Sequence, residues 1–265
     1  RAQALLRDRA GQLEGLVAER TAELTATNKQ LETMVYSIAH DLRQPLRAMQ
    51  GFSALMVEEA GAELNETCSG YANRINKAAQ FMDTLLSDLL TFSAIAQQRF
   101  ELGSVNLETA VELAVSRLGK EINETKARVE TAGPWPKVLA HDATLVRVMF
   151  DLLSNSLKFM APGVKPHIRI WTEDVRLTET TKTTSDNVPA FPSVKVFIQD
   201  NGIGIAPEHQ DQIFRLFLRL HGETYGGTGM GLAIVQKGIE RMGGRMGVDS
   251  TSGQGSRFWF ELQKA

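Results

Sequence analysis

The first third of the chain is patterned in heptads. From residue 6 to residue 38 there is no proline, and apolar residues recur at alternating spacings of three and four. The stripe comprises Leu6, Ala10, Leu13, Val17, Leu24, Leu31, Met34 and Ile38, with Arg20 and Thr27 on the same face. Polar residues on such a seam favour one register at a cost in stability. Residues 1–36 are therefore predicted to form a parallel coiled coil. A single amphipathic helix on its own domain is the alternative, although about five heptads are long for one.

The helical pattern continues from residue 37 to about Ala60, with Pro45 expected to kink it. A polar connection is expected from Gly61 to Gly70. A second amphipathic helix should then end near Gln98, and its apolar stripe comprises Ile75, Met82, Leu85, Leu89 and Phe92. Two helices joined in this way form an antiparallel hairpin over residues 37–100. One hairpin has too little core, so a homodimeric four-helix bundle is expected.

After Gly103 the periodicity changes to shorter elements. Helices are predicted over 107–119, 143–160 and 229–242. Strands are predicted over 167–175, 193–200, 245–250 and 257–262, where β-branched and aromatic residues are enriched. The polar stretch 178–187 is typical of a long mobile hairpin loop. Residues 104–265 are thus expected to form an α/β sandwich with helices on one face of a mixed sheet, which makes the fold class α + α/β.

Composition narrows the possible partners. A chain of 265 residues with a net charge of −2 offers no basic face for nucleic acid, so no nucleic-acid partner is expected. Its single cysteine, Cys68, cannot form an intrachain disulfide, which favours a cytoplasmic location. No apolar run approaches the ~18 residues of a membrane segment. The chain starts at Arg1 within the helical pattern, so it is expected to be a fragment of a longer protein.

The first candidate for chemistry is His40, within the run HDLRQPL at residues 40–46. On the heptad frame His40 falls about 200° around the helix from Ile38, so its imidazole should face solvent. Asp41 beside it can hold the ring and stabilise the positive charge that appears when one nitrogen attacks. A lone exposed histidine is usually an ordinary surface residue, so the surrounding residues must decide.

The second candidate lies on the predicted helix 143–160. Asp151, Asn155 and Lys158 are spaced i, i+4 and i+7, which places them on one polar stripe. A carboxamide oxygen can bind Mg²⁺ while a lysine one turn later meets a phosphate, because Mg²⁺ takes its other ligands from water and nucleotide. A solvated helix face is the ordinary alternative.

Two glycine-bearing turns follow. The first, DNGIG at residues 200–204, ends an apolar strand, where the Asp200 carboxylate can accept a hydrogen bond from an exocyclic amine. The second, GGTGMG at residues 226–231, leads into a helix, and backbone amides at a helix N-terminus bind phosphate. A plain surface turn is the alternative for each. The sequence lacks both the dinucleotide glycine pattern and a Gly-Lys-Ser/Thr P-loop.

Together these blocks resemble the sensor histidine kinases. The run at 40–46 resembles their phosphoacceptor box, residues 151–159 the N box, and the two turns their glycine boxes. The segment 213–219 resembles the F box, in which two phenylalanines anchor the chain to the core; a plain amphipathic turn is the alternative. Asp151 departs from the usual Asn, which leaves its share in metal binding open. The N-terminal run 17–24 resembles the signalling helix that follows a sensor domain, which would be missing from this chain.

The resemblance implies autophosphorylation of His40 by ATP with Mg²⁺, then transfer to an aspartate of a response-regulator receiver domain. It assigns catalysis to His40, Asp41, Lys158 and Arg219, with Asp200 reading adenine, Asn155 holding the metal and residues 220–225 forming a short ATP lid. The nucleotide site it implies comprises Asn155, Lys158, Phe159, Asp200, Gly202, Gly204, Gly227, Thr228, Gly229, Gly231 and Leu232. Rival functions are a nucleotide-binding scaffold without transfer and an ATPase that uses water as acceptor. The first would have lost one of these boxes, and the second lacks the histidine-bearing hairpin.

Overall fold

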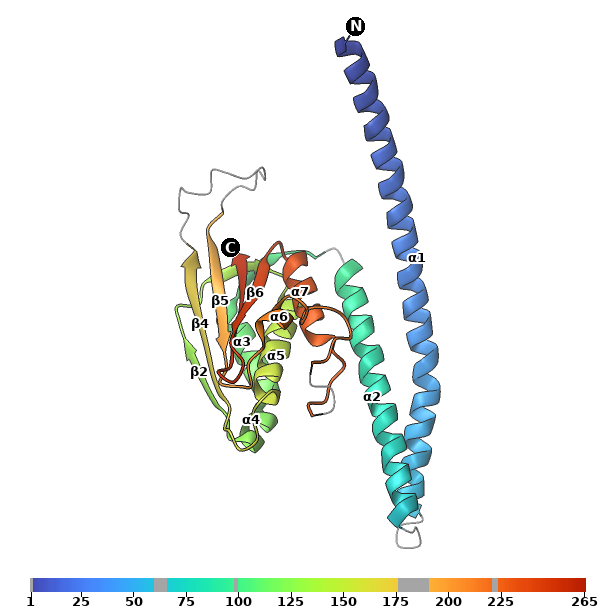
Figure 1. The fold of residues 1–265 in the computed structure, drawn as a ribbon, viewed down its shortest axis with the longest axis vertical. Helices are drawn as coiled ribbons and strands as arrows, with labels where there is room; N and C mark the ends of the chain where they lie inside the picture. Colours follow the sequence, from blue (N-terminus) through green and yellow to red (C-terminus); the bar gives the residue numbers. More distant parts are fainter. Residues whose placement is uncertain (1, 60–65, 98–99, 176–190, 221–223) are drawn as a thin grey trace. The chain divides into compact units, whose positions relative to one another are not determined.

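The fold was analysed in a computed structural model, which describes residues 2–59, 66–97, 100–175, 191–220 and 224–265. It divides into two compact units, Arg1–Ser93 and Ala94–Ala265, called here the helical unit and the sheet unit. Figure 1 shows two long helices in the first and a sheet with helices in the second. The predicted loop at 178–187 lies outside the described residues.

The helical unit is built from α1 (Ala2–Glu59) and most of α2 (Glu66–Gln97). At a rise of 1.5 Å per residue, the 58 residues of α1 span about 87 Å. Pro45 lies inside α1, which continues past it. The expected connection from Gly61 to Gly70 is too long, because α2 already begins at Glu66. Within the described residues, neither helix is long and apolar enough to cross a membrane.

The two helices meet through small side chains. Ala39 and Leu46 of α1 form a buried cluster with Ala79 and Leu86 of α2, and Leu90 packs against it. Between these apolar layers, Arg43 Nε lies 3.4 Å from Asp83 Oδ1. An ion pair within an apolar seam favours one register of the hairpin.

The apolar stripe predicted for the second helix is not the one that closes this contact. Ile75 and Met82 are exposed, whereas Ala79 and Leu86, each one turn away along the helix surface, are buried. A matching exposed stripe on α1 comprises Ile38, Leu42, Met49, Phe52 and Met56. Because residues one turn apart lie on the same side of a helix, each helix has one broad apolar face, of which one edge packs within the hairpin and the other is exposed.

The sheet unit contains a five-stranded sheet in the order β2-β4-β5-β7-β6 and a separate β1–β3 pair. Its strands are β1 (Gly103–Asn106), β2 (Arg128–Ala132), β3 (Lys137–Ala140), β4 (His167–Val175), β5 (Ser193–Gln199), β6 (Arg245–Ser250) and β7 (Ser256–Gln263). Its helices are α3 (Leu107–Arg117), α4 (Gly119–Thr125), α5 (Asp142–Lys158), α6 (Pro207–Gln210) and α7 (Gly231–Arg241). Among the strands that the structure describes, only β2 and β4 pair in parallel. The sheet is mixed, as expected.

Alternation along the strands decides which face is covered. In β7, Phe258, Phe260 and Leu262 lie on one face of the strand and are buried, whereas Arg257 lies on the opposite face and is exposed. These side chains join one core with α3, α5 and α7, which lie on one side of the sheet (Figure 1). The predicted α/β sandwich is confirmed. Five short elements were not predicted from the sequence, namely β1, β2, β3, α4 and α6. Strand β2, for example, reads Arg-Val-Glu-Thr-Ala and carries little apolar signal.

Candidate nucleotide and phosphoacceptor sites

Asp200 follows β5 and is buried, with 8% of its surface exposed. The backbone N–H groups of Gly202 and Ser256 donate to its Oδ1 at 2.8 and 3.1 Å. The Ser156 hydroxyl reaches Oδ2 only at 3.4 Å. Burial raises the pKa of Asp200, and these hydrogen bonds oppose the shift. Oδ1 is thus occupied by two backbone donors, while Oδ2 can still accept a strong hydrogen bond.

The glycines of this turn are required by close backbone approach. A Cβ at Gly202 would collide with the carbonyl oxygen of Phe159, and one at Gly204 with the carbonyl oxygen of Thr251. Gly204 also has φ +68°, in the left-handed region that disfavours side chains. The Ile203 N–H donates to the Phe159 carbonyl at 3.0 Å. The turn is therefore pinned against the end of α5.

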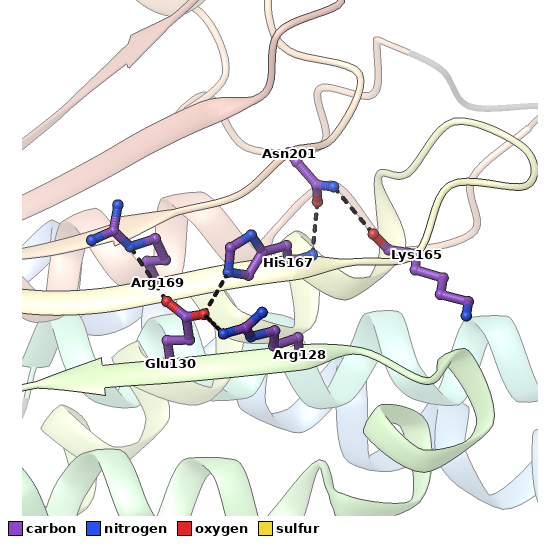
Figure 2. Close-up of polar contacts among 6 residues, drawn as sticks. All are labelled: Arg128, Glu130, Lys165, His167, Arg169 and Asn201. Atoms are coloured by element: carbon purple, nitrogen blue, oxygen red, sulfur yellow. Dashed lines mark hydrogen bonds and ion pairs between the residues drawn. The ribbon is translucent and has the colours of Figure 1, made fainter.

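Asn201 ties the same turn to the start of β4, as Figure 2 shows. Its Oδ1 accepts from the His167 N–H at 2.8 Å, and its Nδ2 donates to the Lys165 carbonyl at 3.1 Å. Nearby, Glu130 of β2 is surrounded by His167, Arg128 and Arg169 (Figure 2).

The His167 imidazole, followed by the two guanidinium groups, lowers the pKa of the Glu130 carboxyl. His167 thus meets an acid that sequence spacing did not reveal, because β2 was not predicted. Within the described residues, no group of three His, Cys, Asp or Glu side chains could hold a metal, so this cluster is a charged contact between two strands.

Two cations approach one another beside the second glycine turn. Lys158 lies at the end of α5, with its Nζ 4.6 Å from the centroid of the Phe159 ring. Burial, and then the charge of Arg219, lower the pKa of Lys158. A Cβ at Gly227, where φ is +128°, would meet the Lys158 ammonium. The structure thus brings Lys158, Arg219 and this turn together, which suits an anion with several negative charges.

The turn leads into α7, whose first residues are Gly231 and Leu232. Thr228 is buried, and its hydroxyl accepts from the Met230 N–H at 3.3 Å. Gly229 has φ +74°, and a Cβ there would collide with the backbone of Phe217 and Leu218. The predicted arrangement of a glycine turn before a helix N-terminus is present.

Asn155 lies half-buried on α5, one turn before Lys158. Among the residues that the structure describes, no side chain engages its carboxamide. Asp151 is buried, and its Oδ2 accepts from Arg147 Nε at 2.7 Å. Asp151 is thus held by a cation on its own helix, whereas Asn155 fits a metal that takes most of its ligands from nucleotide and water.

A cavity of about 420 Å³ adjoins Asp200, and its lining includes Ser250, Gly255, Ser256 and Arg257. Asn155, Lys158 and Arg219 do not line it. This cavity therefore covers only the Asp200 side of the predicted site.

Only one phenylalanine of the segment 213–219 anchors it. Phe214 packs against the core, but Phe217 is 51% exposed. Phe217 also has φ +64°, a strained conformation for a bulky residue. The expectation of two anchors is wrong for Phe217. The lid expected at 220–225 lies partly outside the described residues; Tyr225 is described, and its hydroxyl donates to the Met160 carbonyl at 2.8 Å.

His40 lies on α1 with its side chain exposed, as predicted. Its Nδ1 is 3.3 Å from Asp41 Oδ1, which leaves Nε2 facing solvent. The residues of the two sites thus differ in setting: His40 and Asp41 are open to water, whereas Asp200 and Lys158 are partly or wholly desolvated.

Residues 30–98 match the His Kinase A (phospho-acceptor) domain, and residues 140–265 match the family described as histidine kinase-, DNA gyrase B- and HSP90-like ATPase. The chain belongs to the histidine kinases. Residues 140–265 are accordingly its ATP-binding domain, and His40 lies within its phosphoacceptor domain.

Two curated relatives illustrate the match. The phytochrome-like protein Cph1 of Synechocystis is 31% identical over 247 residues, 93% of this chain and 31% of that protein. The methanogenesis regulatory histidine kinase FilI of Methanothrix harundinacea is 30% identical over 250 residues, 94% of this chain and 26% of that protein. The chain thus spans less than a third of these relatives.

Two solved structures share the fold. Full-length ShkA in complex with AMPPNP has a TM-score of 0.63, with 24% identity over 88% of this chain and 46% of that one. ThkA in complex with the response regulator TrrA has a TM-score of 0.56, with 22% identity over 88% of this chain and 61% of that one.

Proposed function

We propose that this chain transfers the γ-phosphoryl group of ATP to His40 and then to an aspartate of a response-regulator receiver domain. The observation that carries the proposal is the pairing, in one chain, of a solvent-facing His40–Asp41 pair with a desolvated site where Lys158 and Arg219 approach each other. Neither half alone specifies phosphoryl transfer to protein.

At the acceptor, Asp41 orients the imidazole through Nδ1. Nε2 then attacks the γ-phosphorus in line as the bond to the ADP oxygen breaks, and the Nδ1 proton passes to the Asp41 carboxylate. An exposed nucleophile suits a reaction in which a separate unit must deliver the phosphoryl group. The Asp41 side chain is open to water, so Asp41 would accept this proton at an exposed site.

At the donor, Asp200 would read the adenine amine through Oδ2, with Gly202 and Gly204 allowing the base to approach the backbone. Lys158, Arg219 and the amides around Gly227, Thr228 and Gly229 would hold the phosphates. Asn155 would hold Mg²⁺, which neutralises phosphate charge when bound. A polyphosphate also offsets the repulsion between the two cations, so the site is preorganised for it.

A homodimer is proposed from the exposed apolar stripes of the helical unit. Phe52 is 69% exposed, and Ile38, Met49, Ile75 and Met82 are each more than two-fifths exposed. A contiguous apolar face of this kind on two helices is buried by a second hairpin in a four-helix bundle. The seam within one hairpin remains Ala39, Leu46, Ala79 and Leu86.

The remaining partners are proposed from the family. ThkA was solved with its response regulator TrrA, and we propose a receiver domain as the phosphate acceptor here. Because the chain spans less than a third of Cph1 and FilI, we propose that an upstream sensor domain is missing from it. Use of ATP and the single cysteine agree with a cytoplasmic location.

The proposal is tested by incubating the chain with γ-labelled ATP and then treating the product with acid and with base. A phosphohistidine label is lost in acid and retained in base. His40→Gln should abolish labelling while leaving ATP affinity unchanged, and His167→Gln serves as a matched control that should still be labelled. Undiminished label in His40→Gln would refute His40 as acceptor. Phosphate release without label would favour an ATPase, and ATP binding without either would favour a scaffold.

A further inference from the structure

Shortly after α2 the chain makes an aromatic contact that the proposed reaction does not use. Phe100 stacks on the His141 ring, with centroids 4.7 Å apart and planes 8° from parallel. The Arg241 guanidinium lies 5.7 Å from the centroid of the same Phe100 ring. Phe100 also packs against the main core of the unit. We call Phe100, His141 and Arg241 the Phe100 latch.

The latch lies where the two helices of the nucleotide site meet. His141 is the N-cap residue of α5, whose far end carries Asn155 and Lys158. Arg241 is the last residue of α7, whose first turn follows the second glycine block. The His141 N–H donates to the Met242 sulfur at 3.4 Å, and its Nδ1 is 2.9 Å from the Thr144 hydroxyl. Phe100 is thus attached to a rigid part of the ATP-binding domain.

This attachment limits the length of chain between the end of α2 and the body of the ATP-binding domain. Helix α2, which pairs with the helix of His40, ends at Gln97, three residues before Phe100. Three residues span at most about 11 Å. Without the latch, the next regular element is β1 at Gly103, six residues after Gln97, and the limit doubles to about 22 Å.

We propose that the Phe100 latch is a positioning device that keeps this connection short and so raises the rate at which the ATP-binding domain phosphorylates His40. The inference rests on the proposed function. Once a tether is long enough to span its two sites, the effective concentration of the tethered group falls as roughly the −3/2 power of tether length, so doubling the length lowers the rate about threefold. The latch is remote from the nucleotide residues, and ATP affinity should not change.

The first experiment detects the Phe100 latch by proteolysis and does not depend on kinase activity. Arg99 directly precedes Phe100, so trypsin has a cleavage site at the latch. Cleavage requires Phe100, on the C-terminal side of the bond, to leave its contacts. His141→Ala removes the stacked ring without changing the cleavage site and should speed cleavage after Arg99 about fivefold. His141→Phe keeps a flat ring against Phe100 and should restore the slow rate.

The second experiment measures initial rates of His40 labelling and ATP affinity in the full chain. Phe100→Ala and His141→Ala should each be labelled about threefold more slowly at unchanged ATP affinity, with His141→Phe close to the native chain. Leu102→Ala, which alters an exposed side chain of the same segment, should match the native rate.

The outcomes separate the two proposals. A native chain that takes no label refutes the proposed function, and proteolysis then decides whether the latch exists. Unchanged cleavage in His141→Ala overturns the latch itself. Faster cleavage with unchanged labelling, or an equal loss of ATP affinity, overturns its role in positioning.

Discussion

The helical unit and the sheet unit bury apolar surface in opposite ways. The sheet unit closes a continuous core of Leu, Ile, Val, Met and Phe between its helices and its sheet. The described part of the helical unit has one buried cluster of four residues, two of them alanine, and leaves Phe52 and its neighbours open to water. A core of the first kind supports an independent domain, whereas the second requires another chain.

The charged groups of the two units also differ in how far they are buried. His40 and Asp41 keep their contact with water, so neither depends on burial for its chemistry. In the sheet unit, burial shifts the pKa of Asp200 upward and that of Lys158 downward. The proposed acceptor is therefore accessible to another domain, whereas the proposed nucleotide site is desolvated and can bind its ligand tightly. Four predictions test or sharpen this contrast.

The largest expected effect is loss of the dimer when the exposed stripe is charged. Phe52→Glu places a carboxylate where each chain of a dimer would bury a phenylalanine worth about 1.5–3 kcal/mol. The dissociation constant should rise at least about 100-fold, as measured by sedimentation equilibrium. Glu58→Gln, an exposed change on the same helix, is the control. A fragment from Gly103 to Ala265 should be monomeric and still bind ATP; a dimeric fragment would contradict the contrast.

The next effect concerns the buried acid of the nucleotide site. Asp200→Asn can keep the hydrogen bonds from Gly202 and Ser256 but loses the charge-assisted acceptor, so ATP affinity should fall about 10- to 100-fold by calorimetry. Thermal stability should not fall, because a buried carboxylate is replaced by a neutral group. Exposed Asp211→Asn is the matched control. Unchanged affinity in Asp200→Asn would count against the adenine role.

The pKa shifts predict that ATP affinity is lost at both ends of the pH range. The Asp200 pKa is raised by burial, so the required carboxylate is lost on acidification at a higher pH than for an ordinary Asp. The Lys158 pKa is lowered by burial and Arg219, so its charge is lost at a lower pH than for an ordinary Lys.

Folding stability has the opposite trend at the acidic limb. Because the folded-state pKa of Asp200 is raised, its ionisation costs folding stability as the pH rises from the unfolded-state pKa to the folded-state pKa.

Calorimetry of ATP binding across pH should give a bell-shaped curve of ATP affinity. In Asp200→Asn the acidic limb should disappear, and its persistence would assign that limb to another group.

The smallest effect is expected at the ion pair within the hairpin seam. Asp83→Ala leaves the mostly buried Arg43 without its partner and should destabilise the hairpin by about 1 kcal/mol in urea unfolding of the full chain. Replacing both partners, Arg43→Met with Asp83→Leu, should recover the loss, since an apolar pair suits the flanking layers. If the double variant is less stable than Asp83→Ala, the ion pair stabilises the hairpin by more than an apolar pair at the same positions.

Long periodic elements and compact polar motifs could be predicted from sequence because their signals are local. Helices α1, α2, α3, α5 and α7 follow from apolar spacing, and strands β4, β5, β6 and β7 from their β-branched and aromatic residues. The turn at Asp200 and the glycine block before α7 follow from residues next to one another in the chain. The exposure of His40 follows from its place on the helix, since 3.6 residues per turn fix the face of each side chain.

Tertiary structure alone decided which elements and side chains meet. It placed Glu130 beside His167, because β2 and β4 pair across 39 residues of chain. It engaged Asp151 with Arg147, left Phe217 exposed, and brought Phe100 to the ends of α5 and α7. It also decided which edge of the apolar face of each helix closes the hairpin and which edge is exposed. Sequence periodicity reports that a face is apolar, but which neighbour covers that face depends on contacts between residues far apart in the chain.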